Sequence, residues 1–239
     1  MSMLTLVRHG QASFFAADYD RLSDLGEKQA ILLGEHWARL GLGFDEVYTG
    51  PRVRQRQTAD LIGDGLRRAG LPWPDPVVLS ELDEYDLEGL FKRLAPELAR
   101  QRTEFAGLVE SYQGSRGDAE QLRRFQKMFE VLVLHWQESA ESHPQVESWP
   151  TFRDRVRGVL RGIMDRPGRG RRVALFTSGG FVGAATQLAL DAPDRTALEL
   201  SWRVRNGSLT EFVFTRDRFT LDSFNGVPHL EDPSLWTYR

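Results

Sequence analysis

The sequence predicts an α/β fold: a three-layer α/β/α sandwich around a mostly parallel central sheet, with a helical insertion. Short apolar stretches with strand character alternate along the chain with amphipathic helical segments. Such alternation is typical of a parallel sheet that is covered by helices on both faces. The stretch from about 87 to 150 is instead charged and rich in helical patterns. We therefore expect one domain over 1–239, into which 87–150 is inserted as a helical lid.

The first third of the chain contains three predicted strands and two predicted helices. Residues 3–7, 44–49 and 77–82 are short stretches of strand character. Ser23 is expected to be the N-cap of the first helix, and Pro51 fits the first turn of the second helix, where its missing N–H costs nothing. Both helices carry apolar residues at steps of three and four, namely Ala30, Leu33, Trp37 and Leu40 in one and Ala59, Ile62, Leu66 and Ala69 in the other.

The remainder of the chain continues the alternation after the insertion. Within the insertion, Leu122 to Trp136 shows the spacing of one long helix, and "QGSRGD" at 113–118 separates it from what precedes. Thr151 is expected to be the N-cap of a helix that reaches Ile163. An apolar strand at 173–177, a helix from Gly179 to Leu190 and strands at 201–205, 209–214 and 219–224 are expected to follow.

Composition excludes several classes of function. Of the 239 residues 41% are hydrophobic and 27% charged, which is an ordinary balance for a folded domain. A net charge of −3 offers no basic face for nucleic acid. The absence of cysteine excludes disulfides, thiolate nucleophiles and cysteine metal sites. No segment has the roughly 20 apolar residues of a membrane span, and no signal peptide is recognisable. We expect a cytoplasmic protein without a nucleic-acid or membrane partner; the sequence leaves its oligomeric state open.

Residues with catalytic or anion-binding chemistry follow four of the predicted strands. In open α/β sheets, ligands bind beyond the carboxyl ends of the strands, close to helix N-termini. Residues far apart in the sequence are therefore expected to meet at one edge of the sheet. These are Arg8, His9 and Gly10 after the first strand, Arg54 after the second, Glu81 after the third, and Ser178 and Gly179 after the fourth.

The stretch "LVRHG" at the end of the first strand is the most informative of these. A single histidine at a strand end is more often structural than catalytic. Arg8 changes this balance, because a buried guanidinium stays charged and needs an anion. Gly10 removes a side chain where a ligand would approach. A histidine that is held by the backbone at one ring nitrogen presents the other as a nucleophile, so the pattern favours a catalytic His9.

The sequence resembles the histidine phosphatase superfamily, the phosphoglycerate-mutase-like phosphatases, over nearly the whole chain except the insertion. Several motifs occur in the order that the family shows. They are "LVRHGQAS", which carries the Arg-His-Gly motif, "DRLSDLGEKQAILLG", "YTGPRVRQRQTAD", "LSELDEYDLEGL", in which Tyr85 replaces the usual glycine, and "RNGSLTEFVF". The resemblance implies a phosphomonoesterase that acts on a small-molecule phosphate ester.

The resemblance also implies a role for each site residue. His9 would attack phosphorus and become a transient phosphohistidine, while Arg8 and Arg54 would bind the phosphoryl oxygens. Arg54 is preferred to the neighbouring Arg52 and Arg56 because it stands three residues after Pro51, as the family pattern requires. Because the arginines supply the positive charge, no metal and no cofactor are expected.

The same resemblance assigns proton transfer to Glu81, which would protonate the leaving oxygen and then deprotonate the attacking water. Glu81 is preferred to the other acidic residues of its segment because it directly follows the third strand. A run of charges usually marks a solvated face. The competing carboxylates are those of Asp83, Glu84, Asp86 and Glu88.

The fourth strand departs from the family pattern, because Ser178 stands where the family has a second histidine. Ser178 and the N–H of Gly179 can still bind phosphate, but a cationic donor is lost, which typically costs about 10²–10³ in rate. Three interpretations remain: a working enzyme in which Ser178 or another side chain such as His135 or His143 fills the gap, a site that binds phosphate esters with poor turnover, or a different substrate geometry.

Three functions remain possible at this point. The first is a phosphatase, the second is a catalytically impaired phosphate-ester-binding protein on the same scaffold, and the third is a phosphoglycerate-mutase-type phosphotransferase. Phe15, where mutase-like members tend to have asparagine, and the absence of their longer tryptophan-containing loop disfavour the third. The physiological substrate is not predicted by the sequence.

Overall fold

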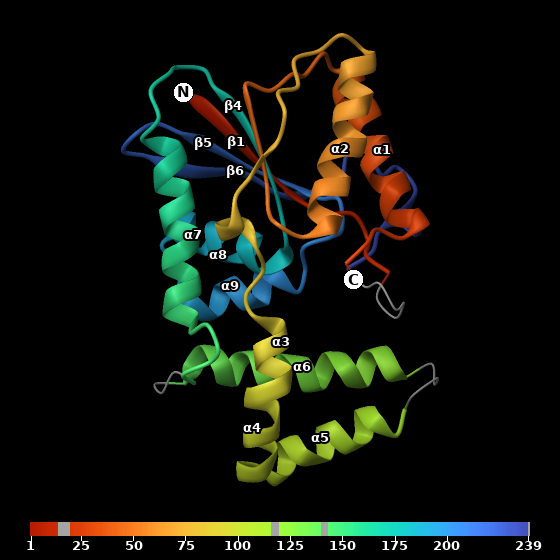
Figure 1. Ribbon diagram of the computed structural model, residues 1–239, viewed down its shortest axis with the longest axis vertical. Coiled ribbons are helices and arrows are strands. Elements are labelled where there is room, and N and C mark those ends of the chain that lie inside the picture. Colours follow the sequence, from red (N-terminus) through yellow and green to blue (C-terminus); the bar gives the residue numbers. More distant parts are fainter. Residues whose placement is uncertain (14–19, 116–119, 140–142, 239) are drawn as a thin grey trace. The chain divides into compact units, whose positions relative to one another are not determined.

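The computed structural model describes residues 1–13, 20–115, 120–139 and 143–238. They form two compact units, of which the first comprises Met1–Glu84 with Arg155–Arg239 and the second comprises Tyr85–Asp154 (Figure 1). Phe15, which bears on the comparison with mutases, lies outside the described residues.

The first unit is built on a six-stranded sheet with the order β3-β2-β4-β1-β5-β6. β1 pairs in parallel with β4, and β2 pairs in parallel with both β4 and β3. β5 is antiparallel to β1 and β6, so it alone runs against the other five strands. The predicted mostly parallel sheet is confirmed. The strands are β1 (Ser2–Arg8), β2 (Glu46–Thr49), β3 (Val77–Val78), β4 (Arg172–Thr177), β5 (Leu209–Phe214) and β6 (Phe219–Gly226).

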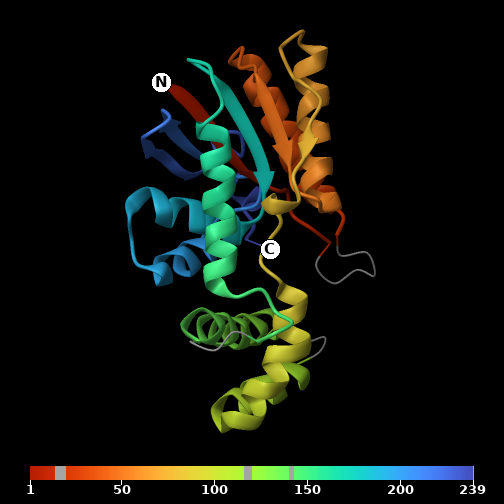
Figure 2. The same cartoon turned by 60° about the vertical axis from the view of Figure 1, so that its left-hand side comes forward.

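Helices cover both faces of this sheet, which confirms the three-layer arrangement (Figures 1 and 2). On one face lie α1 (Asp24–Arg39) and α2 (Val53–Arg68), and their Leu33 and Ile62 share a buried core with Val7 of β1. Side chains alternate along a strand, so the fully buried Leu6 points to the opposite face. That face carries α8 (Gly179–Leu190), α9 (Asp194–Ser201) and the part of α7 (Trp149–Met164) that belongs to this unit.

Two details differ from the sequence-based expectations around the site. The strand predicted for 77–82 ends at Val78 and is followed by a 3-10 turn at Ser80–Leu82, whose Leu82 carbonyl accepts a 2.7 Å hydrogen bond from Thr177 Oγ1. This bond binds the turn to the end of β4 and bends the chain out of the sheet. Pro51 lies before α2, whose N-cap is Arg52.

Two further expectations were wrong in the second half of the chain. Thr151 lies inside α7, and its backbone N–H donates to Ser148 Oγ at 3.3 Å, so Ser148 takes the capping role. The segment 201–205 is not a strand, because Ser201 ends α9 and the Trp202 N–H donates to the Leu198 carbonyl at 3.2 Å. Helical hydrogen bonding there overrides the alternation of the side chains.

The second unit is helical and has an aromatic core of its own. The long helix expected over 122–136 is confirmed as α6. Tyr85 stacks on Trp136 with ring centroids 5.0 Å apart, and Phe125 stacks on Phe129 at 5.7 Å. The helical segments are α3 (Leu87–Gly89), a π-helical turn (Leu90–Leu94), α4 (Ala95–Gln101), α5 (Thr103–Gln113), α6 (Gln121–Glu138) and the beginning of α7. Among the described residues of both units, no helix is long and apolar enough to cross a membrane.

Candidate active site

His9 lies directly beyond β1 and is only 6% exposed. Its Nδ1 donates to the Gly10 carbonyl at 2.7 Å, which places the ring proton on Nδ1 and leaves a lone pair on Nε2. Burial, and then the charges of Arg54 and Arg8, hold the pKa of His9 well below its ordinary value. The imidazole is therefore neutral at physiological pH, which is the state in which a histidine is a nucleophile.

The backbone around His9 is fixed on two sides. The Gly10 N–H donates to Thr58 Oγ1 of α2 at 3.1 Å, and the Asn206 side chain donates to the His9 carbonyl at 3.3 Å. A Cβ atom on Gly10 would lie 2.4 Å from the backbone oxygen of Gly26 in α1. The close approach of α1 therefore already requires glycine at position 10, in addition to any ligand.

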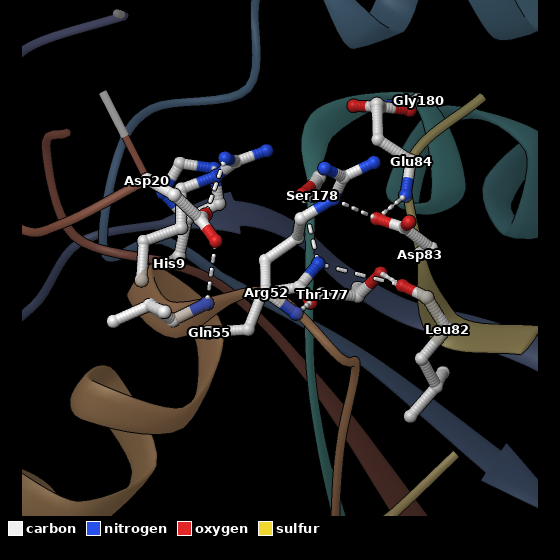
Figure 3. Close-up of polar contacts among 12 residues, drawn as sticks. His9, Asp20, Arg52, Gln55, Leu82, Asp83, Glu84, Thr177, Ser178 and Gly180 are labelled. Carbon is white, nitrogen blue, oxygen red and sulfur yellow. Dashed lines mark hydrogen bonds and ion pairs between the residues drawn. The ribbon is translucent and has the colours of Figure 1, made fainter. Parts of the chain in front are cut away.

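Arg54 lies in the first turn of α2 and is 5% exposed. Its Nε donates to Nε2 of His9 at 3.1 Å, and its Nη1 forms a 2.8 Å ion pair with Asp20. The other carboxylate oxygen of Asp20 accepts the backbone N–H of Val53 at 2.9 Å, so Asp20 holds both the arginine and the start of its helix (Figure 3). The side chain preferred among three neighbouring arginines is thus the one that contacts His9.

Arg8 reaches the same edge of the sheet from the end of β1. Its guanidinium donates to the carbonyls of Val204 and Tyr238, the latter at 2.9 Å. A Cβ atom on Gly179 would lie 3.7 Å from Arg8 Nε, so the guanidinium lies against the N-terminus of α8. These two peptide carbonyls orient the guanidinium of Arg8.

Ser178 is the N-cap residue of α8 and is 2% exposed. Its Oγ accepts a 3.0 Å hydrogen bond from Nε2 of Gln55, which is fully buried in α2 (Figure 3). The Oε1 of Gln55 accepts the backbone N–H of Arg52 at 3.1 Å. Gln55 therefore connects the beginning of α2 with the beginning of α8.

The acidic segment after β3 places its carboxylates in different surroundings. Glu81 is exposed, and its carboxylate accepts from Ser80 Oγ at 3.0 Å. Its own backbone N–H and then Ser80 lower the pKa of Glu81, which is the direction opposite to that required of an acid at neutral pH. Glu84 is partly buried and accepts the backbone N–H of Gly180 at 2.9 Å (Figure 3). Asp83 forms a 2.7 Å ion pair with Arg52.

The structure thus brings together most of the residues that the sequence singled out. His9 contacts Arg54, and Arg8 packs against Gly179 beside the buried Ser178. Among the described residues, the side chain of Glu81 is hydrogen-bonded to Ser80 and to none of these groups. Of the histidine, cysteine and acidic side chains that the structure describes, no three are grouped so that they could hold a metal ion.

Three side chains of this region were not assigned by sequence reasoning: Asp20, Gln55 and Glu84. Asp20 was included in a loop, and nothing in its neighbourhood indicates an ion pair 34 residues away. No sequence signal marks Gln55 as part of the site, because the neighbouring arginines are the more conspicuous candidates. Glu84 was one of several carboxylates in a charge run, and no sequence signal distinguishes it from its neighbours.

One protein-family model matches nearly the whole chain. The family model of the histidine phosphatase superfamily (branch 1) matches residues 4–133 and 115–226. A 2,3-bisphosphoglycerate-dependent phosphoglycerate mutase of Rhodopseudomonas palustris is 36% identical over 96 residues, which are 38% of this chain and 46% of that protein. A 2-carboxy-D-arabinitol-1-phosphatase of Triticum aestivum is 27% identical over 198 residues, 78% of this chain and 32% of that protein. The match spans about half the length of the mutase.

Solved structures share the fold over nearly the full length. A phosphoglycerate mutase from Bacillus anthracis has a TM-score of 0.64 at 18% sequence identity, with coverage of 96% of this chain and 95% of that one. A mycobacterial glucosyl-3-phosphoglycerate phosphatase in complex with VO3 has a TM-score of 0.62 at 21% identity, with coverage of 95% and 100%. At these identities the likeness establishes the fold. The fold therefore occurs in both mutases and phosphatases.

Proposed function

The chain belongs to the histidine phosphatase superfamily, and from that membership we propose that it hydrolyses small-molecule phosphate monoesters through a phosphohistidine on His9. A cytoplasmic location is part of the proposal and rests on the sequence. The observation that carries it is the state of His9: neutral, bound at Nδ1 by the Gly10 carbonyl, and facing the guanidinium of Arg54 with Nε2.

The reaction follows from these contacts in two steps. The Nε2 lone pair attacks phosphorus, the P–N bond forms, and the bond from phosphorus to the leaving oxygen breaks while a carboxylic acid protonates that oxygen. Arg54 and Arg8 bind the phosphoryl oxygens and balance their negative charge. Water then attacks phosphorus while the carboxylate takes its proton, the P–N bond breaks, and inorganic phosphate is released from a neutral His9.

The carboxyl group that moves the proton belongs to the acidic segment after β3. The family pattern selects Glu81 for this role, and that assignment remains a prediction. Ser178 and the N-terminus of α8 would receive a further phosphoryl oxygen. Related folds are known with VO3 and with inorganic phosphate bound, which supports an oxyanion as the ligand of such a site.

A second candidate function is phosphate-ester binding without efficient turnover. The buried Ser178 favours it, because a hydroxyl that already accepts from Gln55 supplies no positive charge. Phosphoglycerate mutase activity is the third candidate, on the strength of the relatives that match 38% of the chain. It would require a bisphosphate primer.

The experiment is hydrolysis of a panel of phosphate esters by the wild type and by His9→Ala. Turnover that His9→Ala abolishes supports the proposal, and acid-labile phosphate on His9 after a rapid quench identifies the intermediate. A wild type as inactive as the variant across the panel overturns it. Stabilisation by vanadate without turnover would then favour the binding protein, and turnover of phosphoglycerate only with a bisphosphate would favour the mutase.

The substitution Ser178→His tests whether the serine weakens catalysis or instead suits the substrate of this protein. We expect a lower rate, because Ser178 is 2% exposed and an imidazole would displace the Gln55 amide. A large rise in rate would instead show that the native site lacks the donor that histidine supplies.

A further inference from the structure

We propose that Glu84, rather than Glu81, exchanges the proton with the leaving group and with water, and so is a catalytic residue of this protein. The inference rests on the proposed function, in which the family pattern alone assigns this work to Glu81. It begins from the contact of the Glu84 side chain with the start of α8.

The carboxylate of Glu84 lies at the helix N-terminus that is assigned to the phosphate. It accepts the N–H of Gly180 at 2.9 Å, two residues beyond Ser178. The intervening Gly179 packs against the guanidinium of Arg8. In Figure 3 the Gln55–Ser178 pair has His9 on one side and Glu84 on the other. An oxyanion at the N-terminus of α8 would therefore have Glu84 as a neighbour.

Glu81 has the opposite surroundings. The 3-10 turn at Ser80–Leu82 leaves its side chain exposed, and Ser80 is the side chain from which its carboxylate accepts. The contacts of this residue lower its pKa. A group in water whose anion is favoured is a poor proton donor at neutral pH.

The backbone that carries Glu84 is held in place by several hydrogen bonds. The Glu84 N–H donates to Asp83 Oδ1 at 2.8 Å, and the same oxygen accepts from Arg52 Nε at 2.7 Å. From α7, Arg155 donates to the carbonyls of Glu81 and Asp83 at 2.8 and 2.9 Å. This network fixes the turn and so directs the Glu84 side chain to α8.

Electrostatics then couples the protonation of Glu84 to ligand binding. Without a ligand, the N–H of Gly180 and the positive end of α8 favour the carboxylate. A phosphate dianion beside it disfavours a second negative charge, so Glu84 takes up a proton when the ester binds. That proton passes to the leaving oxygen as the P–O bond breaks, and the resulting carboxylate takes a proton from the attacking water.

The test compares Glu84→Gln with Glu81→Gln on two substrates. Benzyl phosphate needs a proton on its leaving alkoxide, whereas p-nitrophenyl phosphate expels a stable phenolate. For Glu84→Gln we expect kcat/KM to fall by about 10²–10⁴ on benzyl phosphate and by less than about 10-fold on p-nitrophenyl phosphate. Glutamine can still accept from Gly180, so an unchanged Tm would show that the fold is intact. A purely structural role would lower both values alike.

Glu81→Gln is compared in the same way, and on this inference it should leave the ratio of the two kcat/KM values unchanged. The inference is overturned if Glu81→Gln shows the substrate-selective loss, or if neither variant changes the ratio of the two kcat/KM values.

A binding measurement decides the matter independently of turnover. Calorimetric titration with vanadate, in buffers of different ionisation enthalpy, counts the protons taken up on binding. We expect the wild type and Glu81→Gln to take up more protons than Glu84→Gln. Equal uptake in all three overturns the role of Glu84. An inactive wild type with Glu84-dependent uptake would overturn the proposed hydrolysis while keeping Glu84 beside the anion.

Discussion

Nε of Arg54 and Nε2 of His9 lie 3.1 Å apart, and both side chains are nearly fully buried. The guanidinium N–H points at the lone pair that would attack phosphorus. Burial, and then this cation, hold the pKa of His9 well below its ordinary value, so the contact helps to keep the imidazole neutral and prepares the site for an anion.

Arg54→Lys should lower kcat/KM for phosphate esters by about 10²–10³, because an ammonium lacks the planar fork that reaches His9 and Asp20 together. Steady-state kinetics on p-nitrophenyl phosphate measures this. The exposed Arg56 of the same helix provides the control, and Arg56→Lys should behave as wild type. An Arg54→Lys protein with full activity would remove Arg54 from the site.

Asp20→Asn should tighten the binding of vanadate by about 3- to 10-fold. The Asp20 carboxylate pairs with Arg54 at 2.8 Å and would repel an incoming oxyanion, and the amide removes that charge. Asparagine keeps an oxygen for the Val53 N–H. The measurement is the inhibition constant of vanadate or its effect on Tm. Weaker binding would show instead that Asp20 serves mainly to orient Arg54.

The hydrogen bond between Gln55 and Ser178 should be detectable as a coupling energy. Ser178→Ala and Gln55→Ala each remove one partner of a buried 3.0 Å bond. A double-mutant cycle in urea unfolding should give a coupling of about 0.5–1.5 kcal/mol. The cycle cancels the loss of the other Gln55 contacts, with the Arg52 N–H and with the Leu82 carbonyl. Additive effects of the two substitutions would contradict the bond.

Acid should destabilise the protein partly through His229. This side chain is 5% exposed, burial and then His36 lower its pKa to about 3, and neither ring nitrogen has a hydrogen-bond partner among the described residues. Below its ordinary value of 6.5 the unfolded chain binds a proton that the folded protein does not. The free energy of unfolding therefore falls as the pH falls from 6.5 toward 3, by up to about 1.4 kcal/mol per pH unit.

His229→Phe should reduce this acid sensitivity. At neutral pH both proteins should have similar stability, because no hydrogen bond to the described residues is lost. At about pH 5 the variant should be more stable than wild type by about 2 kcal/mol. Urea unfolding at both pH values gives the comparison. Parallel losses of stability in the two proteins would mean that His229 is protonated in the folded state.

Much of the fold could be predicted from local patterns. The periodicity of three and four located α1, α2 and α6, and Ser23 is indeed the N-cap of α1. Short apolar runs located β1 and β4. At 77–82 the prediction failed because a contact distant in sequence decides, since Thr177 binds the turn after β3. At 201–205 it failed because the helical hydrogen bond from Trp202 to Leu198 overrides the alternation of the side chains.

By itself, the sequence determined the family and which strand ends carry reactive groups, because the order of the motifs and the hydrophobic periodicity are properties of the sequence alone. Only the tertiary structure decided how those groups meet. It paired Asp20 with Arg54, tied Ser178 to Gln55 and aimed Glu84, not Glu81, at α8. The physical reason is that a side chain's charge and reach are local properties, whereas its neighbours depend on where separate strands and helices end in space.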